Sequence, residues 1–520
     1  MALRTSALAL ILTVSVFGAT QASAVTCENL ISLQLRGTTI TAAESIPASS
    51  YTAPDGEVFT DMPAFCRVAA TLTPTSDSDI GIEIWMPVST WNQKFQGVGN
   101  GGFAGSINYT GLAANVKLGY ATVSTDTGHS GESNDASFAL GHPQKIIDFG
   151  YRAVHLMTVI GKQIAVTFYG NLPRHSYFTG CSTGGRQGLM EAQRFASDCD
   201  GIVAGDPVAF YTHHHVGANL WVTWQMFENP ASSLFTTQDT LLGNAVDTAC
   251  DAIDGELNNP RLCHFNPAQL KCVGNQQPPG CLTPPEVRAV DKIWTGPDQT
   301  VHAQGYYPPF EPGGEADGWP SSISPEPPPA PQTDNHEVLG VSFMRNFVFD
   351  NPNWAFQSFN WSIDPAYVDN KEVVPGKTLS EVLNSVDPDL SEFRERGGKL
   401  IQYHGFSDPE VPPLTSINYF ESAATHPGES LNRIHDFYRL FMVPGMNHCQ
   451  GGPGANVFDM LTPLDQWVEQ DSAPDRILAT HYVNNDPAQG VAFTRPLCSY
   501  PQEATYVGGN PNDAANFVCQ

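Results

Sequence analysis

The sequence predicts an α/β fold, with a mostly parallel β-sheet, helices on its faces and one large insertion. The first reason is that short apolar, strand-like segments alternate with helix-patterned segments, which is typical of parallel sheets. The second is the pentapeptide GCSTG at 180–184. This G-x-S-x-G pattern predicts the sharp strand-to-helix turn that raises a serine hydroxyl above the sheet of α/β-hydrolases. We therefore expect an α/β-hydrolase core around Ser182.

The N-terminus has the pattern of a secretory signal peptide. Arg4 gives a positive start, residues 7–19 form an apolar stretch, and Ala22-Ser23-Ala24 resembles a signal peptidase site. The apolar stretch is too short to span a bilayer. We expect residues 1–24 to be removed and the exported, soluble protein to begin near Val25.

The elements of the core can be predicted in order from hydrophobic periodicity. The expected series is a strand with a glycine-rich loop (94–105), a strand (119–125), a helix (147–168), a strand (175–180), a helix (184–195) and a strand (200–205). The strand pattern returns at 399–403 and 436–443.

The regular alternation stops after Asp206. The segment that follows is rich in tryptophan and contains a proline-rich run, which favours loop because proline lacks the backbone donor. We expect a catalytic domain formed by 25–206 and 396–520, and an inserted lid domain formed by 207–395.

Net charge and cysteine content limit the partners and the compartment. A net charge of −28 disfavours nucleic acids and anionic membranes as partners. Eleven cysteines in an exported chain indicate disulfides. Spacing alone does not fix the connectivity, but it makes four local pairs plausible, namely Cys27–Cys66, Cys250–Cys263, Cys272–Cys281 and Cys498–Cys519.

The order of three residues along the chain predicts a catalytic triad. In α/β-hydrolases the nucleophile, acid and histidine follow one another in the chain, each just after a strand. Ser182, Asp408 and His448 meet this requirement. Asp206 is an alternative acid, although it is better explained as the exit from the core into the insertion. His404 also lies near Asp408, where a packing or hydrogen-bonding role is the simpler interpretation.

The tetrahedral intermediate formed by a serine nucleophile also needs hydrogen-bond donors for its oxyanion. One is expected to be the backbone N–H of Thr183, the residue after the nucleophile. The other should come from the glycine-rich loop, where Gly102 is our choice and Gly101 the alternative. The competing interpretation of this loop is a tight turn that merely requires glycine.

Three segments together resemble the tannase and feruloyl esterase family. They are 180–195 (GCSTGGRQGLMEAQRF), 403–413 (YHGFSDPEVPP) and 444–459 (PGMNHCQGGPGANVFD). The resemblance covers nearly the whole mature chain. Bacterial hydrolases of mono(2-hydroxyethyl) terephthalate are similar to the same family.

The resemblance implies roles for individual residues. Ser182 would be the nucleophile, Asp408 the acid and His448 the base. A disulfide between Cys181 and Cys449 would join the neighbours of the serine and the histidine. Cys199 is then left over, and we expect it to be a small buried side chain rather than a reactive thiol.

The resemblance also implies a structural Ca²⁺ site in the lid, because oxygen ligands suit this ion. The matching loop follows Cys250, and its candidate ligands are Asp251, Asp254, Glu256 and Asn258. Asn258 stands where a third aspartate is usual, which reduces the charge of the site. The alternative is a solvated turn. No cofactor is expected for catalysis.

The run His213-His214-His215 could suggest a metal site. Three consecutive side chains point in different directions on any regular element, so a shared metal is not expected. A solvated or substrate-facing loop is the preferred interpretation.

These features predict a secreted serine carboxylesterase that forms an acyl-enzyme on Ser182. The expected substrates are feruloyl or other hydroxycinnamoyl esters, either small or linked to polysaccharide. A tannase, which cleaves galloyl esters, and a terephthalate monoester hydrolase are the alternatives within this class. A secreted protein that binds phenolics without catalysis is the alternative from another class.

Overall fold

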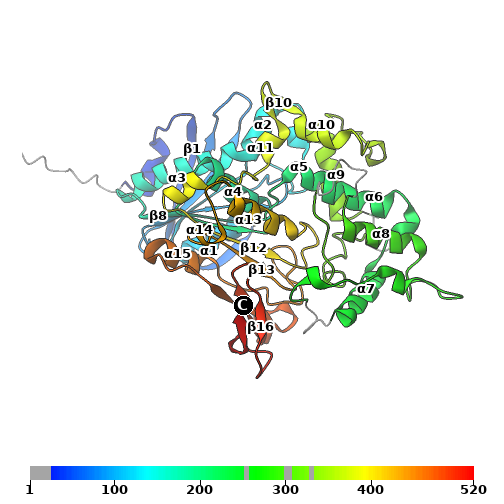
Figure 1. Cartoon of the computed structure of the whole chain (residues 1–520). Helices are drawn as coiled ribbons and strands as arrows, with labels where there is room; N and C mark the ends of the chain where they lie inside the picture. The colour runs from blue at the N-terminus through cyan, green and yellow to red at the C-terminus, as the bar shows by residue number, and fades with distance from the viewer. Residues whose placement is uncertain (1–24, 251–256, 298–306, 327–332) are drawn as a thin grey trace, which may run out of the picture.

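The computed structural model describes residues 25–250, 257–297, 307–326 and 333–520 (Figure 1). The predicted signal peptide therefore lies outside the described residues. Within the described part of the chain, no helix has the length and apolarity needed to cross a membrane.

A nine-stranded sheet forms the centre of the molecule. Across the sheet, its strands are β1 (Thr38–Ile46), β4 (Phe65–Leu72), β5 (Ile80–Pro87), β7 (Ala121–Thr125), β6 (Lys94–Val98), β8 (His175–Cys181), β9 (Gly201–Gly205), β12 (Lys399–Gly405) and β13 (Tyr438–Val443). The six strands from β7 to β13 are parallel, whereas β1, β4 and β5 are antiparallel. The parallel pairing brings the carboxyl ends of β8, β9, β12 and β13 to the same edge.

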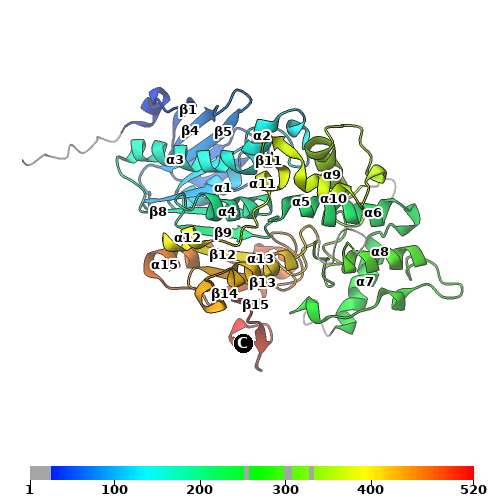
Figure 2. The ribbon, with the colours of Figure 1, turned by 45° about the horizontal axis from the view of Figure 1, so that its top comes forward.

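Helices cover both faces of this sheet (Figures 1 and 2). Tyr177 and Phe178 are adjacent in β8 and belong to separate hydrophobic clusters, as expected for side chains that alternate between faces. On the Phe178 face lie α3 (Ala153–Tyr169), α4 (Thr183–Arg194) and α13 (Leu414–Thr425). On the Tyr177 face lie α1 (Tyr109–Lys117) and α15 (Leu461–Gln470).

The predicted helix at 147–168 is divided in the structure. A short α2 (Pro143–Ile147) leads through a π-helical turn at Asp148–Arg152 into α3. Gly170 ends α3 with a φ of +71°, a conformation that glycine adopts without steric cost. The π-helical turn matters for the site because its carbonyls accept hydrogen bonds from Arg186 on α4.

Between β9 and β12 the chain is mainly helical. Its helices are α5 (Tyr211–His214), α6 (Trp221–Phe227), α7 (Thr236–Ala249), α8 (Pro284–Thr295), α9 (Asn335–Phe343), α10 (Asp364–Asn370), α11 (Leu379–Leu383) and α12 (Ser391–Glu395). Most of this segment, green to yellow in Figures 1 and 2, lies to one side of the sheet, whereas α12 packs against α4 on the face of the sheet. One of its hydrophobic clusters also contains Phe103 and Phe149 from the core. The domain boundaries at 206/207 and 395/396 stay predictions.

The remaining strands form short hairpins outside the main sheet. They are β2 (Ser49–Thr52) with β3 (Val58–Met62), β10 (Glu372–Val374) with β11 (Lys377–Thr378), β14 (Arg476–Tyr482) with β15 (Val491–Cys498), and β16 (Ala504–Tyr506) with β17 (Phe517–Cys519). Helix α14 (Leu431–Ile434) precedes β13.

Five disulfides join ten of the eleven cysteines. They are Cys27–Cys66, Cys181–Cys449, Cys250–Cys263, Cys272–Cys281 and Cys498–Cys519, the same pairs that were expected. Cys199 is buried with a free thiol, and burial raises the pKa of that thiol well above its ordinary value. It is therefore a poor nucleophile.

Candidate active site

Ser182 occupies the tight turn between β8 and α4. Its φ of +63° and ψ of −124° are unusual for a residue with a side chain. The turn is possible because glycines surround it. A Cβ at Gly185 would lie 2.2 Å from the carbonyl oxygen of Gly205, and one at Gly180 would lie 2.7 Å from Cα of Gly184. The backbone thus presents Ser182 at the edge of the sheet.

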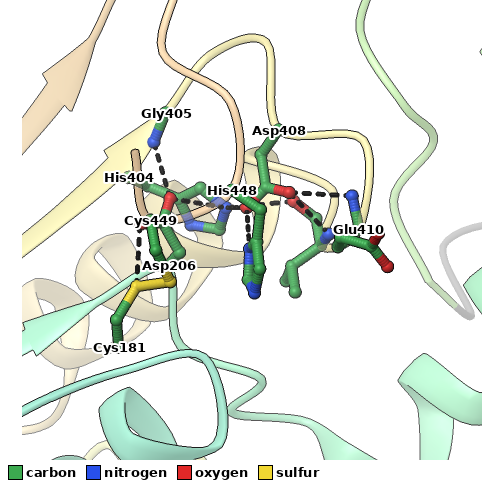
Figure 3. Close-up of a disulfide and its surroundings, with 9 residues drawn as sticks. Cys181, Asp206, His404, Gly405, Asp408, Glu410, His448 and Cys449 are labelled. Carbon is green, nitrogen blue, oxygen red and sulfur yellow. Dashed lines mark hydrogen bonds and ion pairs between the residues drawn. A yellow bond between two sulfur atoms is a disulfide. The ribbon is translucent and has the colours of Figure 1, made fainter. Parts of the chain in front are cut away.

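Asp408 and His448 follow the next strands at this edge and form a hydrogen bond (Figure 3). Nδ1 of His448 lies 2.7 Å from Oδ2 of Asp408. The other carboxylate oxygen of Asp408 accepts the backbone N–H groups of Glu410 at 2.8 Å and Val411 at 3.0 Å. These bonds fix the carboxylate and orient the imidazole, which leaves Nε2 of His448 available for a second partner.

The electrostatics of this pair favour charge separation. Burial opposes the protonation of His448, but the charge and the hydrogen bond of Asp408 outweigh it and raise the pKa of His448 to about 9. Burial likewise opposes the ionisation of Asp408. The charge of His448 and the hydrogen bonds from His404 and His448 nevertheless hold the pKa of Asp408 well below its ordinary range. Asp408 is therefore the ionised carboxylate of the site.

Asp206, the alternative acid, lies in the same network but does not form a hydrogen bond with His448. Its Oδ1 accepts the backbone N–H of Gly405 at 2.8 Å, and its Oδ2 lies 3.2 Å from Sγ of Cys181. Burial raises the pKa of Asp206 to about 7. Asp206 thus joins the ends of β8, β9 and β12.

His404, also expected near the acid, is fully buried beside Asp408. Its Nε2 lies 3.2 Å from Oδ2 of Asp408 and 3.0 Å from the carbonyl oxygen of Val411. Because a carbonyl only accepts, Nε2 carries a proton. Nδ1 lies 2.6 Å from Oγ of Ser416. His404 therefore contacts the same oxygen of Asp408 as His448 does, which agrees with the hydrogen-bonding interpretation.

The disulfide Cys181–Cys449 joins the residue before Ser182 to the residue after His448. The two Cα atoms are 6.0 Å apart although 268 positions separate them in the chain. In Figure 3 the bond lies close to Asp206 and to the left of His448. The turn between β8 and α4 that carries Ser182, here called the elbow, is therefore covalently connected to the loop that carries His448, here called the histidine loop.

The glycine-rich loop lies against the elbow. Gly102 has a φ of +53°, and a Cβ there would lie 2.1 Å from the carbonyl oxygen of Ser133. Oγ1 of Thr183 donates to the carbonyl of Gly102 at 2.6 Å. Within the described part of the chain, the backbone N–H groups of Gly102 and Thr183 donate to no other residue. Both remain available to a ligand.

A cavity of about 890 Å³ opens above these residues. Ser182, His448, Gly102 and Thr183 all line it. The insertion forms the opposite wall with residues that include His214, His215, Asp317, Ser322, Asn335 and Leu339. A serine, a histidine held by a carboxylate, and free N–H donors in one cavity can perform acyl transfer.

Comparison with known proteins agrees with this geometry. A family model described as tannase and feruloyl esterase matches residues 66–520. The chain belongs to the tannase and feruloyl esterase family. Members of this family are carboxylic ester hydrolases, and this chain is an enzyme of that class.

Several relatives of this esterase extend over almost its whole length. Feruloyl esterase C of Talaromyces stipitatus is 31% identical, with 94% of this chain and 91% of the relative covered. An uncharacterised esterase of Xanthomonas campestris is 39% identical, with coverages of 96% and 92%. The crystal structure of feruloyl esterase B from Aspergillus oryzae has a TM-score of 0.83 at 28% identity, covering 94% of this chain and 98% of its own. The α/β-hydrolase fold predicted from the sequence is thereby confirmed.

The three consecutive histidines of the esterase lie on a helix rather than in a solvated loop. His213 pairs with Asp369, with Nε2 to Oδ2 at 2.8 Å. His214 and His215 are buried and line the cavity, and burial lowers the pKa of both well below the ordinary value. The expectation of a loop is wrong, because these residues begin the helical part of the insertion at α5, whereas the expected substrate-facing position agrees with the place of His214 and His215 in the cavity wall. These histidines do not converge on a common point.

Most of the predicted calcium loop lies outside the described residues. This applies to Asp251, Asp254 and Glu256. Asn258 is described, and it lines a cavity of about 600 Å³ together with Asn259 and Glu503. Glu503 accepts a hydrogen bond from Asn259 and pairs with Arg261, so the side-chain oxygen of Asn258 is the described group of a type that suits Ca²⁺. Calcium stays a prediction.

Three polar residues of the cavity were not expected. Glu410 accepts a hydrogen bond from Ser322 at 2.5 Å and another from Asn335 at 2.7 Å. Glu410 comes two residues after Asp408, the predicted acid, and this closeness in the sequence could have indicated that Glu410 lies in the cavity. Ser322 and Asn335 carry no local pattern, since only the packing of the insertion brings them to Glu410.

Proposed function

We propose that this protein is a secreted serine esterase that hydrolyses esters of hydroxylated aromatic acids, with feruloyl esters as the leading substrates. The observation that supports this proposal most strongly is the 2.7 Å hydrogen bond between His448 and Asp408 in the cavity that also contains Ser182. The relatives named feruloyl esterases support the choice of acyl group.

In the proposed mechanism His448 accepts the proton of Ser182 while Oγ attacks the ester carbonyl. The backbone N–H groups of Thr183 and Gly102 stabilise the oxyanion, a contribution that amounts to about 10²–10³ in rate per donor in serine hydrolases. Asp408 stabilises the imidazolium that forms. His448 then donates its proton to the departing alcohol, and water activated by His448 releases the aromatic acid.

The catalytic proposal is tested with a fluorophosphonate probe, which reacts only with an activated serine. We expect stoichiometric labelling of Ser182 in the folded protein, found by peptide mass spectrometry, and no labelling in Ser182→Ala or His448→Ala. Absence of labelling in the folded wild type would instead favour a phenolic-binding protein.

The acyl specificity is tested by initial rates on methyl ferulate, methyl gallate and a terephthalate monoester. We expect the highest kcat/KM for methyl ferulate, because relatives of this chain are named feruloyl esterases. Tyr211, Val208 and Leu339 give the cavity apolar walls that suit the ring of each of these esters. Preference for methyl gallate would indicate a tannase. A faster reaction with a simple acetyl ester would contradict the aromatic-acid assignment. Release of ferulate from a feruloylated arabinoxylan would test polysaccharide-linked substrates.

Secretion is part of the proposal. The signal-like residues 1–24 and the five disulfides support it. N-terminal sequencing of the protein recovered from the periplasm or the medium should begin near Val25. Recovery of the full chain from the cytosol would contradict it.

We also propose a structural Ca²⁺ in the insertion, held by Asp251, Asp254, Glu256 and Asn258. The ion would fix the loop beside the Cys250–Cys263 disulfide and would take no part in catalysis. Chelation should lower the Tm, and added Ca²⁺ should restore it. An unchanged Tm, with no bound calcium in elemental analysis, would contradict this site.

A further inference from the structure

The cavity of the esterase has acidic side chains in its lining without basic ones of permanent charge, among the described residues. Its lining includes two carboxyl side chains outside the triad, Asp317 and Glu410, and among the described residues no lysine or arginine lines it. The internal segments 251–256, 298–306 and 327–332 contain neither lysine nor arginine. They therefore supply no permanently charged cationic side chain, and their one basic group is the imidazole of His302.

The cationic groups near the cavity are already engaged. The N–H groups of Arg186, four residues after Ser182, donate to the carbonyls of Phe149, Gly150 and Leu383, and Arg186 does not line the cavity. His448 is paired with Asp408, so this pair adds no net charge when both are ionised. His214 and His215 are buried and neutral.

Glu410 is the carboxylate that the structure holds most firmly in this wall. Ser322 donates to Oε1 and Asn335 donates to Oε2, so both oxygens are fixed by the insertion. The backbone N–H of Glu410 donates to Asp408 at 2.8 Å. This bond fixes Glu410 within the loop that carries Asp408, here called the acid loop. Both contacts are neutral hydrogen bonds, and among the described residues no lysine, arginine or histidine forms an ion pair with Glu410. Its negative charge therefore acts on whatever enters the cavity.

We propose that the cavity selects substrates by charge, with Glu410 as the specificity-determining residue. It admits neutral aromatic esters whose hydroxyl groups can donate to carboxylates. It disfavours esters that carry a free carboxylate beside the ester group, such as terephthalate monoesters. This inference rests on the proposed function and narrows its substrate class. Like charges roughly 10 Å apart in a protein-like medium repel enough to change binding about tenfold.

The same charge has a consequence for the product. The neutral ester becomes an aromatic carboxylate when the acyl-enzyme is hydrolysed, and at neutral pH the product acid is ionised. The wall that accepts the ester thus repels the acid. Product inhibition by ferulate is weak for this reason.

The test compares two esters of the same shape that differ by one charge. Methyl 4-carboxybenzoate is anionic, whereas its primary amide, methyl 4-carbamoylbenzoate, is neutral. For the wild type we expect kcat/KM to be about tenfold higher for the amide. Glu410→Gln should reduce this ratio severalfold and should lower the Ki of ferulate. Asp317→Asn should change both quantities in the same direction.

The matched control is Glu421→Gln on the outer side of α13, where Glu421 accepts a hydrogen bond from Tyr500. It removes the same charge outside the cavity and should leave the ratio unchanged. Equal kcat/KM for the two esters in the wild type, or a ratio that neither Glu410→Gln nor Asp317→Asn alters, overturns charge selection. If the wild type hydrolyses neither these esters nor methyl ferulate, the proposed function itself fails.

Discussion

At the scale of single residues, the site depends on backbone positions that only glycine can occupy. Gly102 combines a positive φ with a close approach to Ser133, whereas Gly101 next to it has open space around the position of a Cβ. The two residues were alternative candidates for the same oxyanion donor. Replacing each of the two glycines by alanine therefore shows which of them supplies the N–H donor.

We expect Gly102→Ala to lower kcat by about 10²–10³, because the loop must shift and its N–H leaves the oxyanion. Gly101→Ala should keep kcat within a few-fold of the wild type. Steady-state kinetics on methyl ferulate, together with the Tm of each variant, measure this difference. The reverse pattern would assign the donor to Gly101.

The raised pKa of His448 predicts the pH dependence of the reaction. Only neutral imidazole can accept the serine proton, so kcat/KM should rise with pH up to about 9. Asp408→Asn removes the group that raises this pKa, and burial then shifts the acidic limb below the ordinary value of about 6.5. The charge of Asp206 raises the pKa of His448 less than that of Asp408 does, so Asp206→Asn should shift the acidic limb of the pH profile less. An acidic limb that stays in place in Asp408→Asn would contradict the assignment.

At the scale of elements, the parallel strands position the three residues of the proposed triad, and a disulfide joins the neighbours of the serine and the histidine. The strands β8, β12 and β13 carry Ser182, Asp408 and His448 on loops at one edge of the sheet. Loops are the mobile part of such a site, since they lack the ladder of hydrogen bonds that fixes strands. Cys181–Cys449 restrains two of these loops.

Replacing both Cys181 and Cys449 by alanine should lower kcat at a temperature where the variant is still folded. The elbow and the histidine loop then move independently. The control is the double alanine variant of Cys498 and Cys519, which lies in the C-terminal hairpins. Loop-closure entropy predicts a loss on the order of 5 kcal/mol for the first pair and 3 kcal/mol for the second. A wild-type kcat in the first variant would show that the bond is structural only.

The parallel elements could be predicted because their apolar segments are short, regular and bounded by helices. The antiparallel strands β1, β4 and β5 were not predicted. In β1 only Ile40 is buried, so this strand lacks a clear apolar pattern. Strands β4 and β5 are largely buried and precede the first segment of the predicted series. Sequence order and strand context located Ser182, Asp408 and His448. The contact of Glu410 with Ser322 and Asn335 could not be predicted, because it forms between segments 75 and 88 positions apart.

At the scale of the whole molecule, the insertion shares its interior with the core. Phe347 of the insertion packs against Phe103 and Phe149 of the core, with ring centroids 5.9 Å apart in both pairs. Arg186 on α4 donates to the carbonyl of Leu383 in α11. The acid loop is also bound to the insertion, since Nε2 of His336 lies 2.8 Å from the carbonyl oxygen of Pro409.

We therefore expect the insertion and the core to unfold together. Phe347→Ala removes a fully buried ring and should lower the free energy of unfolding by about 3–5 kcal/mol. The denaturation curve should keep one transition. Leu262→Ala, at a site 72% exposed, should leave stability unchanged. Two separate transitions in Phe347→Ala would show that the insertion folds by itself.

The bond between Cys181 and Cys449 also makes activity depend on the redox state of the surroundings. The chain is synthesised with reduced cysteines, and in that state nothing covalent holds the histidine loop at the elbow. Together with the proposed secretion, the predicted loss of kcat without this bond means that full activity would be expected only in the compartment where disulfides form.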